Sequence, residues 1–426
     1  MRTQRATYIP RLIDGELDEL LNGLPAVALD GAKGVGKTVT ARRRADRVVR
    51  LDVDQEREAF ASSPFDLLPD GTLLLDEWQR FPESWDRVRR AVDAGAPPGS
   101  FLLTGSAPPA GTKIHSGAGR IVVRRLRPMS LVERGVARPT VSLATLTEGS
   151  HTSISGTSTV TLSDYVEEIF ASGLPGVRPL PPALRNEQLD GYLEGGVQRE
   201  FAEQGIAVRR PQTLIAWLRA YAAATATTAS YTTILDAATA GVDAKPARDT
   251  TLVYRDVLAR AFLLDPIEPW IPVFHPLKRL TRAPKHFLAD PALAVRLLGL
   301  EREAVLTGTD TPRPTIGQGS MLGALFEHLV TQSVLVYAQS IAGRVSHMRQ
   351  REGRHEIDLI VEHRRKVVAI EVKLAPTVQA RDVRHLLWLR QLMPDIVADT
   401  LIVTTGPHAY RRSDGVAVVP AALLGP

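Results

Sequence analysis

The segment Gly31-Ala-Lys-Gly-Val-Gly36-Lys37-Thr38 restricts the possible folds of this chain more than any other feature of its sequence. It matches the spacing G-x-x-x-x-G-K-[ST], follows the apolar run AVALD, and precedes a helical pattern. Such a loop needs a buried strand before it and a helix after it, so that backbone amides and the helix start face one anion. The sequence therefore predicts a strand–loop–helix unit that binds phosphate.

Each part of this loop has an expected chemical role. Its glycines let backbone N–H groups surround a β-phosphate, Lys37 reaches the β- and γ-phosphate oxygens, and the Thr38 hydroxyl binds Mg²⁺. The expected ligands are therefore ATP and Mg²⁺. The loop residues predicted to contact them are Gly31, Ala32, Lys33, Gly34, Val35, Gly36, Lys37 and Thr38.

Short apolar runs alternate with helical patterns through the first third of the chain, which predicts an α/β domain with a buried parallel sheet. The expected strands are 26–30, 48–53, 72–76 and 101–104, and the expected helices are 38–48 and 85–92. Two of these strands end in polar groups. Asp76 is expected to hold Mg²⁺ through water and Glu77 to polarise an attacking water. Thr104 and Ser106 are expected where a γ-phosphate would be sensed.

The last hundred residues contain a second group of charged residues. Asp358 lies in HEIDLIV, and Glu371 and Lys373 follow in VVAIEVKLA, where they point to the same face of a strand. Asp358 and Glu371 are expected to bind Mg²⁺, while Lys373 orients or activates water for attack on a phosphodiester. Two half-exposed strands with salt-bridged surfaces would give the same pattern, so that alternative stays open.

The middle of the chain is less specific. Residues 140–163 are rich in Ser, Thr and Gly, which predicts a polar loop or linker rather than packed core. Three amphipathic patterns between 211 and 262, followed by the extended segment LLDPIEPWIP, fit a winged helix, although other helical bundles would show the same periodicity. Tyr254 and Arg255 lie where a winged helix places its DNA-reading helix.

Taken together, the segments GAKGVGKT, LLLDEWQ, FLLTGSA and GAGRIVVRRLRPMSLVERG make the chain resemble prokaryotic AAA-type ATPases that carry a C-terminal DUF4143 region. The resemblance implies that the TGS segment is the sensor. DUF4143 regions are similar to PD-(D/E)XK nucleases, which implies that Glu327 in GALFEHLV is a further metal ligand. For Arg120, a charge-stabilising finger and a structural ion-pair partner are both open.

The fold class that follows is α/β, with an N-terminal P-loop AAA-type parallel sheet domain, a helical and winged-helix middle, and a C-terminal restriction-endonuclease-like α/β domain. The expected divisions are 1–139 for the ATPase domain, 140–163 for a polar linker or insertion, 164–210 for a helical connector, 211–285 for the winged-helix-like domain and 286–426 for the DUF4143 domain.

Composition excludes several classes of protein. The absence of cysteine rules out disulfides, Cys-bound zinc and cysteine nucleophiles. No run of 18 apolar residues is present and the N-terminus has no signal-like apolar stretch, so we expect a cytoplasmic chain without a membrane span. The formal net charge is +5, and only eight of the 52 basic residues are lysine.

Two functions from different classes fit these observations. The first is a Mg²⁺-dependent ATPase coupled to DNA binding and to metal-dependent DNA cleavage by the C-terminal domain. The second is a nucleotide-dependent switch or scaffold, of defence or toxin–antitoxin type, whose nuclease-like domain does not cleave. A small-molecule kinase is disfavoured because no segment resembles an acceptor-binding lid. DNA is the expected partner, and a homo-oligomer is left open.

Overall fold

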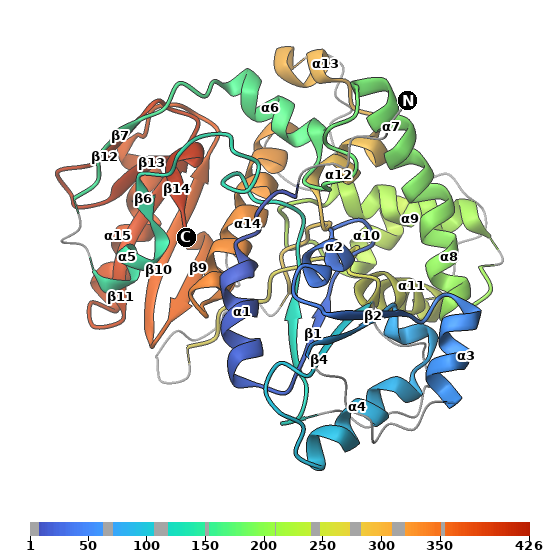
Figure 1. The fold of residues 1–426 in the computed structure, drawn as a ribbon. Coiled ribbons are helices and arrows are strands. Elements are labelled where there is room, and N and C mark those ends of the chain that lie inside the picture. Colours follow the sequence, from blue (N-terminus) through green and yellow to red (C-terminus); the bar gives the residue numbers. More distant parts are fainter. Residues whose placement is uncertain are drawn as a thin grey trace.

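The computed structural model of the chain describes residues 8–62, 71–105, 118–149, 153–208, 210–239, 248–272, 283–308, 320–350 and 354–426. Figure 1 shows a parallel sheet near the N-terminus, a group of helices beside it, and a second sheet formed by the last part of the chain. These parts share a core, because the largest hydrophobic cluster includes Leu29 of the first sheet, Trp217 of the middle helices and Val403 of the second sheet.

The N-terminal sheet has five parallel strands in the order β2-β3-β4-β1-β5. They are β1 (Ala26–Asp30), β2 (Arg47–Arg50), β3 (Leu73–Asp76), β4 (Phe101–Gly105) and β5 (Val122–Arg125). The helical elements of this part are α1 (Ile13–Gly23), α2 (Lys37–Arg42), α3 (Asp54–Ser62), η1 (Trp78–Arg80) and α4 (Glu83–Asp93). Apolar side chains cover both faces of β1, β3 and β4, as expected where helices pack on each side of a parallel sheet.

The four predicted strands of this sheet are confirmed. The helix after the loop is shorter than expected, since α2 ends at Arg42, and neither α3 nor β5 was predicted. Because all five strands are parallel, their carboxyl ends meet at one edge of the sheet. The segments that follow β1, β3 and β4 therefore lie close together there.

The middle of the chain is helical, as predicted. Its elements are α6 (Leu162–Ala171), α7 (Pro182–Gly191), the π-helical η2 (Tyr192–Gly196), α8 (Val197–Glu203), α9 (Pro211–Ala223), α10 (Tyr231–Ala238), α11 (Arg248–Arg260), α12 (Pro291–Leu298) and α13 (Arg302–Thr307). After α11, isolated antiparallel bridges join Leu264 to Leu288 and Ile267 to Lys285. The winged helix stays a prediction.

The C-terminal sheet is mixed, with seven strands in the order β7-β12-β13-β11-β10-β9-β8. Its last six strands in the sequence are β8 (Arg344–Arg349), β9 (Glu356–His363), β10 (Lys366–Lys373), β11 (Val397–Thr404), β12 (His408–Arg411) and β13 (Ala417–Pro420). The other elements of this part are α14 (Met321–Ser340), η3 (Ala380–Val383), α15 (Arg384–Leu392), η4 (Ala421–Leu423) and β14 (Leu424–Gly425).

Helix α14 is the central helix of this fold. By length and composition alone it could cross a membrane, but 67% of its apolar window is buried inside the chain. It packs against α1, α6, β8 and β10, so it touches elements of the first sheet, the middle and the second sheet. Figure 1 shows it between the C-terminal sheet and the other two parts. Its apolar surface is therefore explained by packing within the chain.

The segment 140–163 corrects one expectation. It contains β6 (Val141–Ser142), α5 (Leu143–Glu148) and β7 (Gly156–Thr157), and Leu143 and Leu146 are fully buried. Strand β6 pairs with β14 and β7 pairs with β12. The expectation of a polar linker outside the packed core is therefore wrong for its described residues. Its few apolar residues pack in the core. Its polar residues have structural roles, since Ser142 and Thr161 cap the helices α5 and α6 and Thr157 belongs to the paired strand β7.

Buried charges join the first sheet to the middle of the chain. Arg125 and Arg127 make ion pairs of 2.7 and 2.8 Å with Asp265, which follows α11. Burial lowers the pKa of Arg125 to about 10. Burial alone would raise the pKa of Asp265, but the two arginines outweigh it and hold that pKa below its ordinary value. Asp265 is therefore ionised and offsets one of the two positive charges that meet beside it.

Replacing Asp265 by Ala is expected to lower the free energy of unfolding by about 3–5 kcal/mol, because Arg125 and Arg127 would lose their shared buried partner. Urea denaturation followed by circular dichroism measures the change. Asp54→Ala is the matched control, since the Asp54 side chain is 81% exposed in its pair with Arg57 and should matter little. Equal effects of the two substitutions would contradict this role.

Candidate functional site

The loop between β1 and α2 has the backbone shape that its sequence predicts. Gly36 adopts φ +100° immediately before α2, a conformation that disfavours any side chain. Gly31 lies so close to the chain after β5 that a Cβ atom would stand 2.2 Å from the Leu126 carbonyl oxygen. The Leu126 amide in turn donates to the Asp30 carbonyl at 2.7 Å. Gly36 is therefore required by the backbone conformation of the turn, and Gly31 by the close approach of the Leu126 carbonyl.

The polar residues predicted for phosphate and Mg²⁺ converge at this edge of the sheet. Thr38 donates to Asp76 Oδ1 at 2.9 Å, and Thr104 donates to the same oxygen. Lys37 is only 6% exposed, and its Nζ donates to the carbonyls of Gly31 and Ala32 at 2.7 and 3.0 Å. The structure thus brings together residues of α2, β3 and β4 that are up to 67 positions apart in the sequence.

Two further carboxylates act on Lys37. Burial lowers the pKa of Lys37, while the charges of Glu77 and Asp30 oppose that change. Glu77 lies directly after β3 in the left-handed region, with φ 56°, and accepts a 2.6 Å hydrogen bond from Gln79. Such a conformation at a residue other than glycine is held by its surroundings and is typical of functional positions. Burial raises the pKa of Asp30 to about 6, and Lys37 opposes it.

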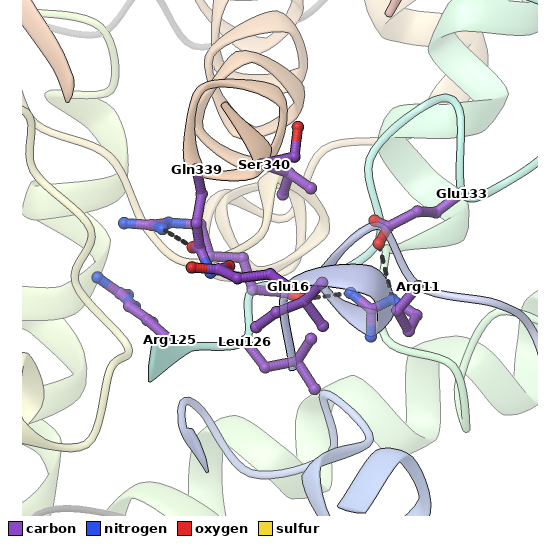
Figure 2. Close-up of a pocket in the computed structure, with 10 residues that line it drawn as sticks. Arg11, Glu16, Arg125, Leu126, Glu133, Gln339 and Ser340 are labelled. Atoms are coloured by element: carbon purple, nitrogen blue, oxygen red, sulfur yellow. Dashed lines mark hydrogen bonds and ion pairs between the residues drawn. The ribbon is translucent and has the colours of Figure 1, made fainter. Parts of the chain in front are cut away.

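Arg11 holds the loop through a hydrogen bond to its backbone, a role that no pattern in the sequence indicated. Its guanidinium forms a buried 3.0 Å ion pair with Glu133, donates to the Val35 carbonyl of the loop at 2.9 Å, and donates to the Arg127 carbonyl at 2.6 Å. Figure 2 shows Arg11 and Glu133 facing each other on one side of a pocket that Gln339 of α14 also lines. One side chain therefore fixes the loop, the chain after β5 and the Glu133 turn together.

The middle helices also reach the loop. Lys33 makes ion pairs of 2.7 Å with Glu200 and 3.1 Å with Glu203, both on α8. Glu203 is further paired with Arg80 of η1 at 2.7 Å. Pro175, which follows α6, lies near Gly36. The predicted ligand Lys33 is therefore held by another part of the chain, and Glu200 is a buried carboxylate that sequence analysis missed.

The residues present fit a nucleotide triphosphate with Mg²⁺, because the loop leaves no room for a Cβ atom at Gly31, and a hydroxyl and a carboxylate meet next to Lys37 at Thr38 and Asp76. Of the remaining predicted residues, Ser106 lies outside the described residues. Arg120 is 2.8 Å from Asp93 of α4, an ion pair that agrees with the structural alternative for this residue.

The C-terminal residues predicted for a second metal site also come together. Asp358 of β9 accepts a 2.9 Å hydrogen bond from the Val372 amide, and Glu371 of β10 accepts one of 3.2 Å from the Asp358 amide. Lys373 lies 3.4 Å from Glu371. The unpredicted residue is Lys285, whose Nζ contacts Glu327 of α14 and lies 2.8 Å from Asp358. We call the side chains of Lys285, Glu327, Asp358, Glu371 and Lys373 the acidic cluster.

The acidic cluster carries three carboxylates and two ammonium groups in a buried place. Burial raises the pKa of Glu327 to about 8 and raises that of Glu371 well above its ordinary value, and the charge of Asp358 adds to both changes. Burial would also raise the pKa of Asp358, but Lys285 and Lys373 outweigh it and lower that pKa to about 2. The excess negative charge is therefore relieved by proton uptake on a glutamate rather than on Asp358.

The acidic cluster does not fit a divalent metal ion. Both Asp358 oxygens and both Glu371 oxygens already accept hydrogen bonds or ion pairs from the protein. Within the described ranges, no three His, Asp or Glu residues are grouped to hold a metal. His328 and His347 are buried, and their Nε2 atoms lie 2.7 and 3.0 Å from the backbone carbonyls of Leu288 and Ala283.

Comparison with known families agrees with this division of the chain. Residues 24–134 match the AAA domain model, residues 162–304 match a domain of unknown function, DUF8612, and residues 322–424 match another, DUF4143. The chain therefore carries an AAA-type P-loop ATPase domain, a helical middle, and a DUF4143 C-terminal region with a mixed seven-stranded sheet. The AAA match suggests ATP binding and hydrolysis.

The relatives that match along most of the chain are uncharacterised proteins. The chain is 26% identical over 419 residues to uncharacterised proteins of Mycobacterium tuberculosis (Rv2008c) and Mycobacterium bovis (Mb2031c), covering 95% of this chain and 82% of each relative. Among solved structures, the Walker-type ATPase PABY2304 of Pyrococcus abyssi is 12% identical, with a TM-score of 0.33 over 70% of this chain and 97% of that one. The Aeropyrum pernix ORC2 protein is 13% identical, with a TM-score of 0.31 over 70% and 95%.

The acidic cluster predicts a pH dependence of stability. A carboxyl whose pKa is about 8 when folded and 4.5 in its ordinary state binds a proton that the unfolded chain releases, so its stabilisation is complete below about pH 4.5 and is lost as pH rises through 8. Between pH 5 and 8, Glu327→Gln should therefore make the urea midpoint fall less steeply with rising pH than in the unsubstituted protein. Parallel midpoint profiles would contradict the raised pKa.

Proposed function

We propose that this chain is an ATP-dependent switch in which Mg²⁺-ATP binds at residues 31–38 and is hydrolysed there. The observation that carries the proposal is the convergence of Lys37, Thr38, Asp76 and Thr104 at one edge of a parallel sheet. A lysine, a hydroxyl next to it and a strand-end carboxylate are the groups that P-loop enzymes need for phosphoryl transfer. The match of residues 24–134 to the AAA domain model supports the same conclusion.

Each residue has a distinct part in the proposed reaction. Lys37 and the loop amides bind the phosphates, and Thr38 and Asp76 would hold Mg²⁺, which offsets phosphate charge when bound. Glu77 orients and polarises the attacking water, because it directly follows the Asp76 strand and its charge reaches Lys37. Thr104 connects β4 to Asp76 and so links the neighbouring strand to the phosphate site.

The contact of the loop with α8 supplies the switch. Lys33 belongs to the loop, yet Glu200 and Glu203 hold its ammonium. Burial raises the pKa of Glu200, and Lys33 opposes that change. Phosphate oxygens bound in the loop would compete with these carboxylates for Lys33 and would be repelled by them. Nucleotide binding therefore weakens the hold of the loop on α8, and hydrolysis restores it.

DNA as a partner stays a prediction. In the middle region, Tyr254 is buried and packs edge-on against Phe201, and Arg255 pairs with its neighbour Asp256 at 3.1 Å, so these two residues are not free readers of DNA. Fluorescence anisotropy with labelled duplex DNA, with and without ATP, tests binding. For the C-terminal domain, the position of Lys285 favours the non-cleaving alternative over a nuclease.

Two substitutions separate binding from hydrolysis. Lys37→Ala should abolish ATP binding and phosphate release, whereas Glu77→Gln should retain ATP binding within a few fold and lower the hydrolysis rate by about 10²–10⁴-fold, the usual contribution of a general base. Phosphate release and binding of a fluorescent ATP analogue measure the two properties. Lys366→Ala, at an exposed lysine, is the control. Full hydrolysis by Lys37→Ala would overturn the proposal.

The switch contact has its own test. Replacing Glu200 and Glu203 together by Gln should tighten ATP binding by about 10-fold, equivalent to about 1.4 kcal/mol, because Lys33 is released and two negative charges leave the phosphate site. Glu58→Gln, an exposed residue of α3, should leave the affinity unchanged. Unchanged or weaker ATP binding by the double variant would remove the switch while leaving the ATPase assignment intact.

A further inference from the structure

Lys285 enters the acidic cluster from a fixed piece of backbone. Its amide donates to the Ile267 carbonyl at 2.9 Å, and its carbonyl accepts from the Ile267 amide at 3.0 Å. The residue is 1% exposed. Lysine is rarely buried unless it is paired, and here the ammonium contacts Glu327 and Asp358, which come from α14 and β9. The side chain is therefore built into the cluster rather than passing by it.

Both oxygens of Asp358 and both oxygens of Glu371 are already used by the protein, and Glu327 pairs with Lys285. Asp358 Oδ1 accepts from Lys285 at 2.8 Å and its Oδ2 from the Val372 amide at 2.9 Å. Glu371 Oε2 accepts from the Asp358 amide and its Oε1 faces Lys373. A Mg²⁺ ion needs oxygen ligands at about 2.0–2.1 Å in octahedral geometry. The Asp358 oxygens are turned toward Lys285 and the Val372 amide, and the Glu371 oxygens toward the Asp358 amide and Lys373, so each already has a partner from the protein.

Charge leads to the same result. Lys285 and Lys373 offset two of the three carboxylates, so the cluster has at most one unbalanced negative charge. Adding a divalent ion would place four positive charges against three negative ones in a buried space, which is strongly unfavourable. The nuclease pattern of Asp358, Glu371 and Lys373 provides one lysine, and Lys285 is the additional cation.

We propose that the Lys285 ammonium takes the place of the divalent cation in the acidic cluster, so that the C-terminal domain neither binds Mg²⁺ there nor cleaves a phosphodiester. Lys285 instead joins the segment between α11 and α12 to α14 and β9. The cluster then has a structural role, in which its ion pairs hold the middle region of the chain against α14 and the C-terminal sheet. This inference concerns the C-terminal domain and does not depend on ATP binding at the loop.

Binding of Mn²⁺ to the full chain without nucleotide tests the proposal, with electron paramagnetic resonance as the readout. The unsubstituted protein should show no Mn²⁺ site that depends on Asp358. Lys285→Met nearly keeps the length of the side chain and removes its charge, which leaves Glu327 and Asp358 at the vacated position and Glu371 next to Asp358. That variant should gain one Mn²⁺ site on Glu327 and Asp358, and the double variant Lys285→Met, Asp358→Asn should lose it again.

Controls separate the proposal from general effects. Lys366→Met makes the same exchange at an exposed lysine of β10 and should gain no site. Unchanged circular dichroism and ATP hydrolysis by Lys285→Met show that the chain is folded and that the loop is independent. Failure of a folded Lys285→Met to gain a Mn²⁺ site would overturn the proposal, since Lys285 would then not be the group that excludes the ion.

The unsubstituted protein provides a second test that needs no folded variant at position 285. Labelled duplex DNA incubated with it and Mg²⁺ or Mn²⁺, with and without ATP, should stay intact to the level of a no-protein control. Scission that is lost in Asp358→Asn would contradict the proposal directly, as would an Asp358-dependent Mn²⁺ site in the unsubstituted chain.

Discussion

The proposed function depends on the parallel register of β1, β3 and β4. Because these strands run in one direction, Asp30, Asp76 and Thr104 end at the same edge of the sheet, beside the glycine loop. A single Asp76 oxygen accepts from both Thr38 and Thr104, which ties three elements to one point. The loop could not hold this shape alone, since Gly31 is wedged against the Leu126 carbonyl and Arg11 holds Val35 from beneath.

Ion pairs then connect this edge to the rest of the molecule. Lys33 reaches α8 of the middle helices, and Asp265 receives two arginines from the end of the first sheet. In the C-terminal part, Lys285 links the middle to α14 and β9. Breaking a buried pair by removing one partner is strongly destabilising, so the pairs of Asp265 and Lys285 fix the relative placement of the parts they join. Lys33 is partly exposed, so its pairs with α8 are easier to break, as the proposed switch requires.

Sequence patterns predicted what is local and missed what is long-range. The loop, the strand ends at Asp76 and Thr104, and the pair Glu371 and Lys373 follow from spacing along single elements, and the structure places them as expected. Arg11, Glu200 and Lys285 act on residues 24 to 167 positions away, and no periodicity along the sequence indicates such a partner. Lys285 had one weak signal, because lysine is scarce in a chain that uses arginine for most positive charge. The segment 140–163 misled because its polar composition hid the few apolar residues that pack.

The most direct test of the central claim is calorimetric titration of the unsubstituted chain with a non-hydrolysable ATP analogue and Mg²⁺. If the loop binds nucleotide as the geometry indicates, the titration gives one site per chain, and omitting Mg²⁺ weakens it because Thr38 and Asp76 lose their shared ion. A titration without binding heat, confirmed by the absence of any thermal stabilisation by the analogue, would contradict the account.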